Sequence, residues 1–188
     1  MQKVLLIDNY DSFTYNLVEL LRQTGCRVEV MKNDRVDDAA VSVHDAIILS
    51  PGPGLPADAG ITREIIQKYH TTKKMLGVCL GHQAIAEVFG ARLKQLPQPM
   101  HGEKTLARSV AEDALLEGLP ESFAIGHYHS WVVASEKLPE DLVVISRDES
   151  QEIMALRHRI YNVWGVQFHP ESIMTSEGKR IIANFLEM

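Results

Sequence analysis

The sequence is short of the residues that mark several classes of protein. Its 188 residues include only two cysteines, Cys26 and Cys79, which are too few for a disulfide framework and favour a reducing, cytoplasmic setting. The formal net charge of −6 lacks the basic excess on which binding to nucleic acid or to an anionic membrane depends. No apolar run approaches the roughly 18 residues that cross a bilayer. We therefore expect no nucleic-acid partner and no membrane partner.

The N-terminal segment also lacks the features of a signal peptide. MQKVLLIDNYDSF has one lysine and a short apolar run, and acidic residues follow at once without a small-residue cleavage site. This segment predicts a first strand. The chain length and an ordinary hydrophobic content of 45% predict a single globular domain over residues 1–188.

What the sequence does contain is a regular alternation of apolar patterns. In the first 90 residues, short apolar runs typical of strands buried on both faces alternate with helical runs. Strands are expected at Lys3–Asp8, Val28–Met31, Asp45–Leu49 and Lys74–Val78, and helices after Ser12 and at Ile61–Tyr69 and Gln83–Phe89. The alternation predicts an α/β fold, with an open, mostly parallel, twisted sheet flanked by helices on both faces.

The pattern changes after about residue 90. Short alternating runs predict further strands at Thr105–Ser109, Ser122–Ile125, Leu142–Ser146, Glu152–Arg157 and Val163–Phe168. A last helix is expected over Ser176–Leu186. We expect these strands to extend the sheet in antiparallel orientation within the C-terminal half.

Ligands of open α/β sheets usually bind beyond the carboxyl ends of the strands. One segment in such a position is Gly77-Val78-Cys79-Leu80-Gly81, which has the form of a nucleophile elbow. A sharp strand-to-helix turn would expose Cys79, and the flanking glycines would avoid a clash. The positive end of the helix dipole would favour a thiolate. A small buried cysteine in an ordinary connection is the alternative, and this segment alone leaves both open.

A second segment, His169-Pro170-Glu171, follows the last expected strand. A cysteine nucleophile needs a base within hydrogen-bond reach, and histidine with a carboxylate behind it suits that role. Taken alone, the segment could equally be a surface turn. His127 and His129 raise a metal site as another alternative, but the sequence lacks the remaining ligands of the zinc signatures. We therefore expect no metal, and a surface or supporting role for His127 and His129.

The loop Pro51-Gly52-Pro53-Gly54 is a third candidate. Its glycines could present bare backbone N–H groups to a developing negative charge, as an oxyanion hole does. The spacing matches neither pattern of phosphate-binding loop. An ordinary turn is the alternative.

Together these motifs resemble one enzyme family. They occur in the order Leu6–Thr14 (LIDNYDSFT), Ser50–Gly54 (SPGPG), Gly77–Gln83 (GVCLGHQ), Tyr128–Ser130 (YHS) and Gly165–Glu171 (GVQFHPE). The whole chain resembles the class I, triad-type glutamine amidotransferases, which have a flavodoxin-like sheet. More narrowly, it is similar to the small subunits of anthranilate synthase and aminodeoxychorismate (para-aminobenzoate) synthase. The LIDNYDSFT opening and Met100-His101-Gly102 point to this chorismate-using branch.

The resemblance implies a mechanism and a partner. Cys79 would attack the side-chain amide of glutamine, His169 would carry the proton, and Glu171 would orient His169. The resemblance places glutamine and its oxyanion against Gly52, Pro53, Gly54, Leu80, Gln83, Ser130 and Trp131. Ammonia would pass to a large synthase subunit that acts on chorismate, with no cofactor in this subunit.

This sequence departs from the family pattern at two positions. Trp131 replaces the aliphatic residue that usually follows the YHS motif, and Glu103 stands where a lysine usually follows Met-His-Gly. Because only the backbone of residue 131 is expected to bind glutamine, the first departure matters little. The second weakens the assignment of this segment to the partner interface.

The partner is expected to cover the mouth of the active site. The loops expected on that face are Asn9–Phe13, Met100–Lys104 and His127–Ser130. A stand-alone cysteine hydrolase of the γ-glutamyl hydrolase kind and a non-catalytic regulatory subunit are two other hypotheses. The IDNYDSFT match argues against the first, and the presence of Cys79, His169 and Glu171 argues against the second. Whether the product is anthranilate, aminodeoxychorismate or both stays open.

Overall fold

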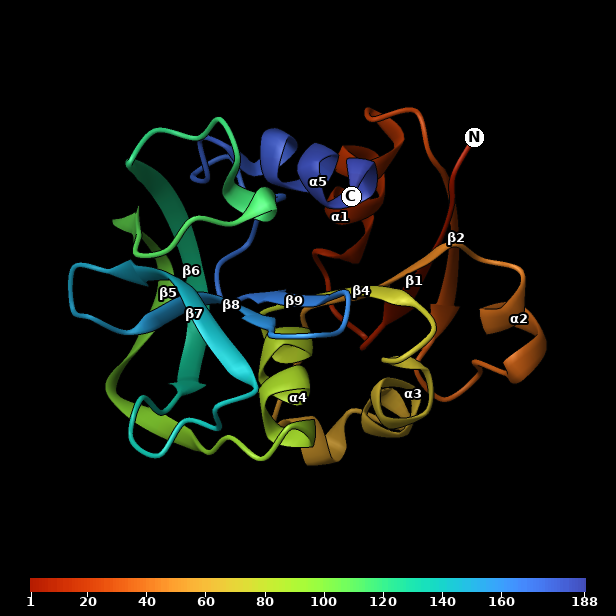
Figure 1. Ribbon diagram of the computed structural model, residues 1–188, viewed down its shortest axis with the longest axis horizontal. Coiled ribbons are helices and arrows are strands. Elements are labelled where there is room, and N and C mark those ends of the chain that lie inside the picture. The colour runs from red at the N-terminus through yellow and green to blue at the C-terminus, as the bar shows by residue number, and fades with distance from the viewer.

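The computed structural model describes residues 1–188 and contains one nine-stranded sheet (Figure 1). From one edge to the other, the strands are β2 (Arg27–Lys32), β1 (Lys3–Asp8), β3 (Ala46–Leu49), β4 (Lys74–Val78), β9 (Val163–Val166), β8 (Ile153–His158), β7 (Leu142–Asp148), β5 (Leu93–Ser109) and β6 (Ser122–Val133). The five strands from β2 to β9 are parallel, and the remaining strands pair antiparallel. The order of the parallel strands is the flavodoxin-like one. The predicted α/β sheet with an added antiparallel part is thus confirmed.

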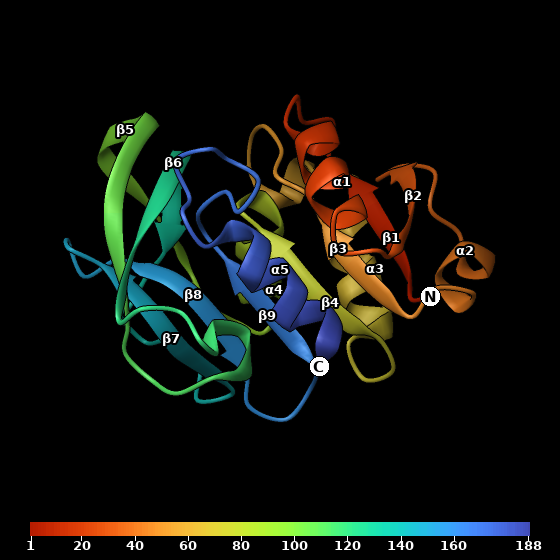
Figure 2. The same cartoon turned by 90° about the horizontal axis from the view of Figure 1, so that it is seen from above.

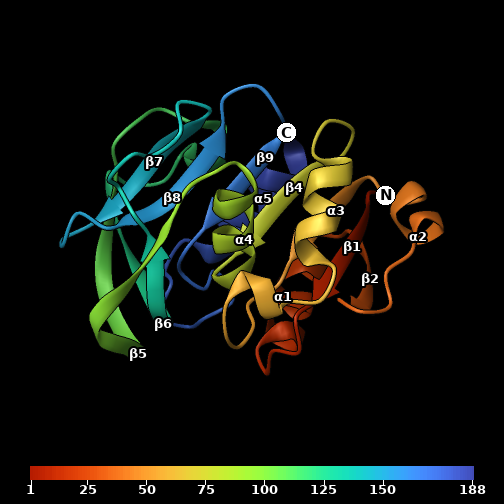
Figure 3. The same cartoon turned by 90° about the horizontal axis from the view of Figure 1, so that it is seen from below.

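Helices cover both faces of the parallel strands. Helices α1 (Thr14–Arg22) and α5 (Gly178–Glu187) lie on one face, and α3 (Thr62–Tyr69) and α4 (Leu80–Val88) on the other (Figures 1 and 3). Seen from above in Figure 2, α1 and α5 lie over the strands on the same face of the sheet. None of the helices is both long and apolar enough to cross a membrane.

The alternation of side chains along β1 explains this layering. Leu6 belongs to the core cluster that includes Leu17 of α1, whereas its neighbour Ile7 belongs to the cluster that includes Ile66 of α3. All four side chains are fully buried. Since successive side chains of a strand point to opposite faces, an unbroken apolar run requires a layer of helices on each side.

Several elements differ from the sequence-based expectation, among them β6, which extends to Val133 rather than Ile125. A five-residue helix, α2 (Asp38–Ser42), was not predicted, since a segment this short contains too few residues to establish an apolar periodicity. Helix α4 begins at Leu80, three residues before the expected start. Strand β5 runs for 17 residues from Leu93 to Ser109, whereas the sequence predicted only its last part, Thr105–Ser109. Its pairing with β6 shifts between Gln95 and Met100, where two prolines lack the N–H that a regular ladder needs.

Candidate active site

Two segments far apart in the sequence meet where β4 and β9 end. These strands pair in parallel, with Val78 opposite Val166. The backbone N–H of Cys79 donates to the carbonyl of Val166 at 2.8 Å. The residues that follow the two strands therefore lie side by side at the carboxyl edge of the sheet, which brings Cys79 close to the segment that contains His169.

Cys79 has the backbone of a sharp strand-to-helix turn. Its φ of 51° and ψ of −102° lie in a region that non-glycine residues rarely occupy, and it is the N-cap of α4. A Cβ at Gly77 would lie 2.4 Å from the backbone of Gly81, and a Cβ at Gly81 would lie 2.4 Å from the carbonyl oxygen of Leu49. Both glycines are therefore needed for the turn, as the sequence motif predicted.

His169 and Glu171 form a buried pair. His169 Nδ1 lies 2.7 Å from Glu171 Oε1, and the two side chains are 2% and 0% exposed. The other ring nitrogen, Nε2, has no partner other than the neighbouring Cys79 thiol. Burial alone would lower the pKa of His169, but the nearby Cys79 thiol and Glu171 carboxylate raise it to about 10. The arrangement leaves Nε2 free to exchange a proton on the side away from Glu171.

A cavity of about 510 Å³ opens in front of Cys79. All seven residues expected to bind glutamine or its oxyanion line it, namely Gly52, Pro53, Gly54, Leu80, Gln83, Ser130 and Trp131. They come from the loop after β3, the first turn of α4 and strand β6. A second cavity, of about 380 Å³, shares Cys79 with the first and is lined by His169 as well.

Backbone N–H groups without a protein acceptor occur in two segments that line the first cavity. The N–H groups of Gly52 and Gly54 have no protein acceptor, and neither does that of Leu80 in the first turn of α4. Gly52 is tightly packed, since a Cβ added there would lie 2.6 Å from Leu80 Cδ2 and 2.7 Å from Asn9 Cβ. The site thus has free N–H groups beside Cys79, and a side chain at position 52 would displace the loop that carries two of them.

Gln83 and Gln167 connect the cavity with the sulfur. Gln83 Nε2 donates to the Trp131 carbonyl at 2.8 Å and to Gln167 Oε1 at 3.2 Å. Gln167 Nε2 in turn lies 3.7 Å from Cys79 Sγ. Gln167 was not among the predicted site residues. A polar residue inside the apolar run Val163–Phe168 was the available signal in the sequence.

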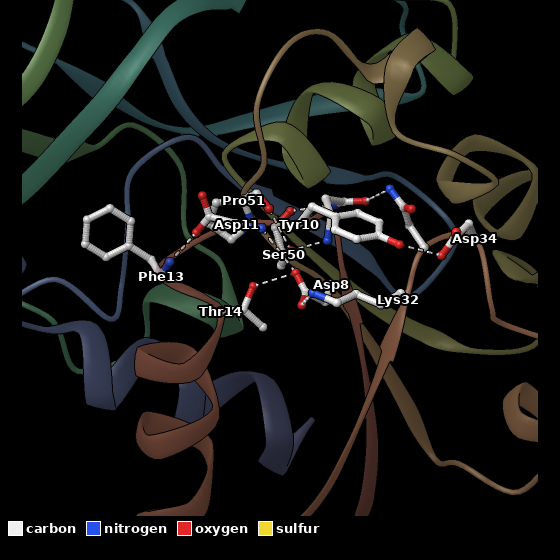
Figure 4. Close-up of polar contacts among 11 residues, drawn as sticks. Asp8, Tyr10, Asp11, Phe13, Thr14, Lys32, Asp34, Ser50 and Pro51 are labelled. Atoms are coloured by element: carbon white, nitrogen blue, oxygen red, sulfur yellow. Dashed lines mark hydrogen bonds and ion pairs between the residues drawn. The ribbon is translucent and has the colours of Figure 1, made fainter.

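The loop after β1 is fixed by buried polar groups (Figure 4). The Asp8 carboxylate accepts hydrogen bonds from Thr14 Oγ1 at 2.9 Å and from Lys32 Nζ at 2.5 Å. Its Oδ1 also accepts the backbone N–H of Asp11 at 3.2 Å. These bonds hold the start of α1 against the end of β1 and so define the course of the loop between them.

Two aromatic rings, one of them from this loop, pack against the buried histidine. The ring centroid of Phe13 lies 4.9 Å from that of Tyr128 and 5.7 Å from that of His169. Tyr128 and His169 are 5.0 Å apart by the same measure. The three rings come from the loop after β1, strand β6 and the loop after β9. His169 is therefore shielded on the side of the β1–α1 loop.

His127 and His129 are not surface residues, contrary to one of the two roles expected for them. They are 0% and 4% exposed. His127 Nδ1 lies 2.9 Å from His129 Nε2, and His127 Nε2 lies 2.7 Å from Thr105 Oγ1. Burial lowers the pKa of His127 to about 4 and that of His129 to about 3. Both rings are therefore enclosed, and their lowered pKa values favour neutral imidazoles.

His82 is also enclosed. Its side chain is fully buried, and neither ring nitrogen has a hydrogen-bond partner. A Cβ added at Gly165 would lie 2.6 Å from His82 Nδ1, so the imidazole ring packs directly on the backbone of β9. Burial lowers its pKa to about 4. Nowhere does the structure bring together three or more His, Cys, Asp or Glu side chains that could hold a metal ion.

Comparison with known proteins places these features in a family. The family described as "Glutamine amidotransferase class-I" matches residues 5–188. Aminodeoxychorismate synthase component 2 of Klebsiella aerogenes is 43% identical over 185 residues, which cover 97% of this chain and 98% of the relative. Anthranilate synthase component 2 of Mycobacterium tuberculosis is 45% identical over 191 residues, which cover 98% of this chain and 81% of the relative.

A third relative carries both names. Aminodeoxychorismate/anthranilate synthase component 2 of Bacillus subtilis is 44% identical over 186 residues, covering 98% of this chain and 95% of the relative. Among solved structures, a putative GMP synthase protein from Thermoplasma acidophilum superposes with a TM-score of 0.89 at 26% identity, covering 100% of this chain and 93% of that one. With a family match over nearly the whole chain and close relatives of full length, this protein belongs to the class I glutamine amidotransferases.

Proposed function

We propose that this chain is the glutaminase component of a two-subunit synthase, releasing ammonia from glutamine for a partner that acts on chorismate. The observation that carries the proposal is that Cys79 and His169, which is paired with Glu171, line one cavity of about 380 Å³, in a chain over 40% identical to component 2 of such synthases. No cofactor is required, since the proposed reaction needs only a nucleophile, a proton carrier and a stabilised oxyanion.

The proposed reaction begins with the thiol of Cys79. Its proton resides on His169 Nε2, as the raised pKa of this histidine favours, and the ionised sulfur attacks the side-chain carbonyl carbon of glutamine. The carbon–nitrogen bond then breaks, the proton passes from His169 to the leaving nitrogen, and ammonia departs from a γ-glutamyl thioester. Water, activated by the same imidazole, releases glutamate and restores the thiol. Glu171 accepts from Nδ1 and stabilises the imidazolium.

The negative charge that develops on the amide oxygen is stabilised by backbone donors. The N–H of Leu80 and those of Gly52 or Gly54 are the proposed oxyanion hole. Leu80 lies at the N-terminus of α4, whose dipole adds to the effect. Removing one such donor typically costs on the order of 100-fold in turnover.

The rest of the glutamine molecule is proposed to occupy the cavity of about 510 Å³. Its volume suits a small polar substrate, and its lining includes the polar side chains of Asp58, Gln83 and Gln95. The Trp131 carbonyl already accepts from Gln83 Nε2, so Gln83 Oε1 is the side-chain atom available to the substrate. Recognition by Ser130 and Trp131 would then use the remaining backbone groups.

The large subunit is proposed to dock over the second cavity. The residues that line this cavity include Tyr10–Phe13, His101 and Tyr128, one group from each of the three segments expected at the interface. Two of these segments, Met100–Lys104 and His127–Ser130, were expected to be loops but belong to strands β5 and β6. Docking there would close the route by which ammonia reaches water. The whole chain is proposed to act as one domain, and the free thiols of Cys26 and Cys79 suit a cytoplasmic complex.

Reconstitution with the partner tests the proposal. The purified chain is mixed with a large synthase subunit, chorismate and either glutamine or a high concentration of ammonium. The Cys79→Ser variant should lose glutamate release and glutamine-dependent product, while ammonium-dependent product stays at the wild-type level. Equal loss with both nitrogen sources would assign Cys79 a structural role and contradict the proposal. Pairing the chain in turn with an anthranilate-forming and an aminodeoxychorismate-forming subunit identifies the product.

A further inference from the structure

Gln167 lies beside Cys79 because of the register of two strands. Val78 of β4 is opposite Val166 of β9, so the next residues along the two chains are Cys79 and Gln167. The Gln167 side chain is completely buried, and its backbone N–H donates to the Met154 carbonyl at 2.8 Å. Its position is therefore fixed by the sheet rather than by a mobile loop.

The orientation of the Gln167 amide follows from a chain of hydrogen bonds. The Trp131 carbonyl can only accept, so the atom of Gln83 that faces it at 2.8 Å must be the nitrogen Nε2. The same Nε2 lies 3.2 Å from one amide atom of Gln167, which must then be the oxygen. The remaining atom of Gln167 is the nitrogen, and it lies 3.7 Å from Cys79 Sγ. A backbone carbonyl of β6 thus determines that an N–H group is directed at the sulfur.

We propose that Gln167 is a further functional residue of this site, whose side-chain N–H donates to the sulfur of Cys79 and holds it ionised and correctly directed for attack on glutamine. This inference rests on the proposed function, in which Cys79 is the nucleophile. It adds a donor to the sulfur besides the imidazolium of His169.

The need for such a donor follows from the burial of the sulfur. Cys79 is only 5% exposed, so water supplies few of the hydrogen bonds that an ionised sulfur requires. A donor N–H to a charged acceptor makes a stronger bond than one between neutral groups. The chain from Trp131 through Gln83 to Gln167 also joins a wall of the glutamine cavity to the nucleophile. A movement of Gln83 when glutamine binds would therefore shift the Gln167 amide that donates to Cys79 Sγ.

The test compares the pH dependence of Cys79 alkylation in the wild type and in Gln167→Met, which preserves volume but has no N–H. The intact chain is treated with iodoacetamide between pH 5 and 10, and modification of Cys79 is followed by peptide mass spectrometry, which separates it from Cys26. In Gln167→Met we expect the pH at which Cys79 alkylation reaches half its maximal rate to rise by about one unit. Near neutral pH this corresponds to a roughly tenfold slower alkylation. In the reconstituted complex, kcat for glutamate release should fall more than KM rises.

Two further variants separate this role from a loss of packing. Ser146→Ala removes another buried hydrogen bond of the sheet, from Ser146 Oγ to the Arg108 carbonyl at 3.0 Å, and should leave the alkylation profile unchanged. Gln167→Glu keeps the shape and the acceptor for Gln83, but places a negative charge at the sulfur. Gln167→Glu should also raise the pH at which alkylation reaches half its maximal rate. It replaces Gln167→Met in the test if that variant does not fold.

The outcomes distinguish this inference from the proposed function. If the wild type releases glutamate and Cys79→Ser does not, but the alkylation profile and kcat of both Gln167 variants equal those of the wild type, the role of Gln167 is wrong and the proposed function stands. If Cys79→Ser still releases glutamate, the proposed function itself fails. The titratable groups that share the two cavities with Cys79 are the same in every variant: Tyr10, Asp11, Asp58, His101, Tyr128, His129 and His169.

Discussion

Asn9 and Ser50 join the loops that follow two neighbouring strands. The backbone N–H of Asn9 donates to Ser50 Oγ, and Asn9 Nδ2 donates to the Ser50 carbonyl, both at 2.8 Å. Asn9 also lies against Gly52, one of the proposed oxyanion donors. The loop after β1 therefore supports the loop after β3, where strand order reverses and α/β proteins commonly bind ligands.

Asn9→Ala should impair glutamine turnover beyond its effect on stability. The change leaves the buried Ser50 carbonyl and the Thr62 hydroxyl without their partner, at a cost of about 1–3 kcal/mol in the free energy of unfolding. We expect glutamate release by the complex to fall at least about tenfold, because the oxyanion loop loses its support. Denaturant unfolding and glutamate release measure the two effects.

Thr62→Val is the matched control. Thr62 Oγ1 donates to Asn9 Oδ1 at 2.7 Å on the side away from Ser50. Its removal should lower stability by a similar amount while preserving the Asn9–Ser50 contacts and most of the activity. Equal loss of activity in the two variants would show that Asn9 acts through general stability alone.

Gly52→Ala should displace the loop that carries the proposed oxyanion donors. The added Cβ would lie 2.6 Å from Leu80 Cδ2 and 2.8 Å from the Asn9 carbonyl oxygen, and backbone cannot give way as a flexible side chain does. We expect turnover to fall roughly 100-fold, with a stability loss of about 1–3 kcal/mol.

Gly25→Ala provides a comparison with a stability cost but no contact with the site. Gly25 has a φ of +82° and no atoms within 4 Å of an added Cβ, so the change costs about 1–2 kcal/mol from backbone strain alone. Turnover should stay at the wild-type level. If both glycine variants lost turnover in proportion to stability, the steric explanation at Gly52 would be wrong.

Glu171→Gln should weaken the protein most at low pH. The pKa of His169, about 10 in the folded chain, exceeds its ordinary value of 6.5, so its contribution to stability is complete below pH 6.5 and is lost as pH rises through 10. A glutamine accepts from Nδ1 but does not attract the imidazolium. We expect a loss of about 1–3 kcal/mol at pH 6 that shrinks by pH 9 in denaturant unfolding. A constant difference across this range would contradict the assignment.

His82→Met should reduce sensitivity to acid. Burial lowers the pKa of His82 to about 4, so the unfolded chain binds a proton between pH 6.5 and 4 that the folded chain does not. Stability falls as pH decreases through this window, by up to about 1.4 kcal/mol per unit for one proton. The variant should show a shallower decline in unfolding free energy from pH 6.5 to 4.5. The exposed His101→Met should keep the wild-type slope.

Much of the parallel half of the fold was predictable because burial on both faces requires unbroken apolar strands. Lys3–Asp8 and Lys74–Val78 were predicted with the bounds that the structure has. Strand β5 was not, since prolines at 97 and 99 interrupt the alternation that identifies a strand. Pairing with β6 over most of its length compensates, and such long-range pairing leaves no local signal.

The predicted site residues lie together, but one contact to the sulfur could not be predicted from local patterns. Gln167 is placed beside Cys79 by the β4–β9 register, a relationship between residues 88 positions apart. The burial of His127 and His129 depends in the same way on the full length of β6. Both are properties of strand pairing, which sequence periodicity alone does not specify.

The position of β9 has a consequence for the order in which the protein folds. It is the last strand in the sequence, yet it lies in the middle of the sheet, between β4 and β8. During synthesis, β1 to β4 can pair with one another, and β5 to β8 can do the same, but the two groups join only when β9 inserts between them. The same insertion brings His169 to Cys79. A partly synthesised chain thus exposes no assembled nucleophile and base, and closure of the sheet and completion of the site are a single event.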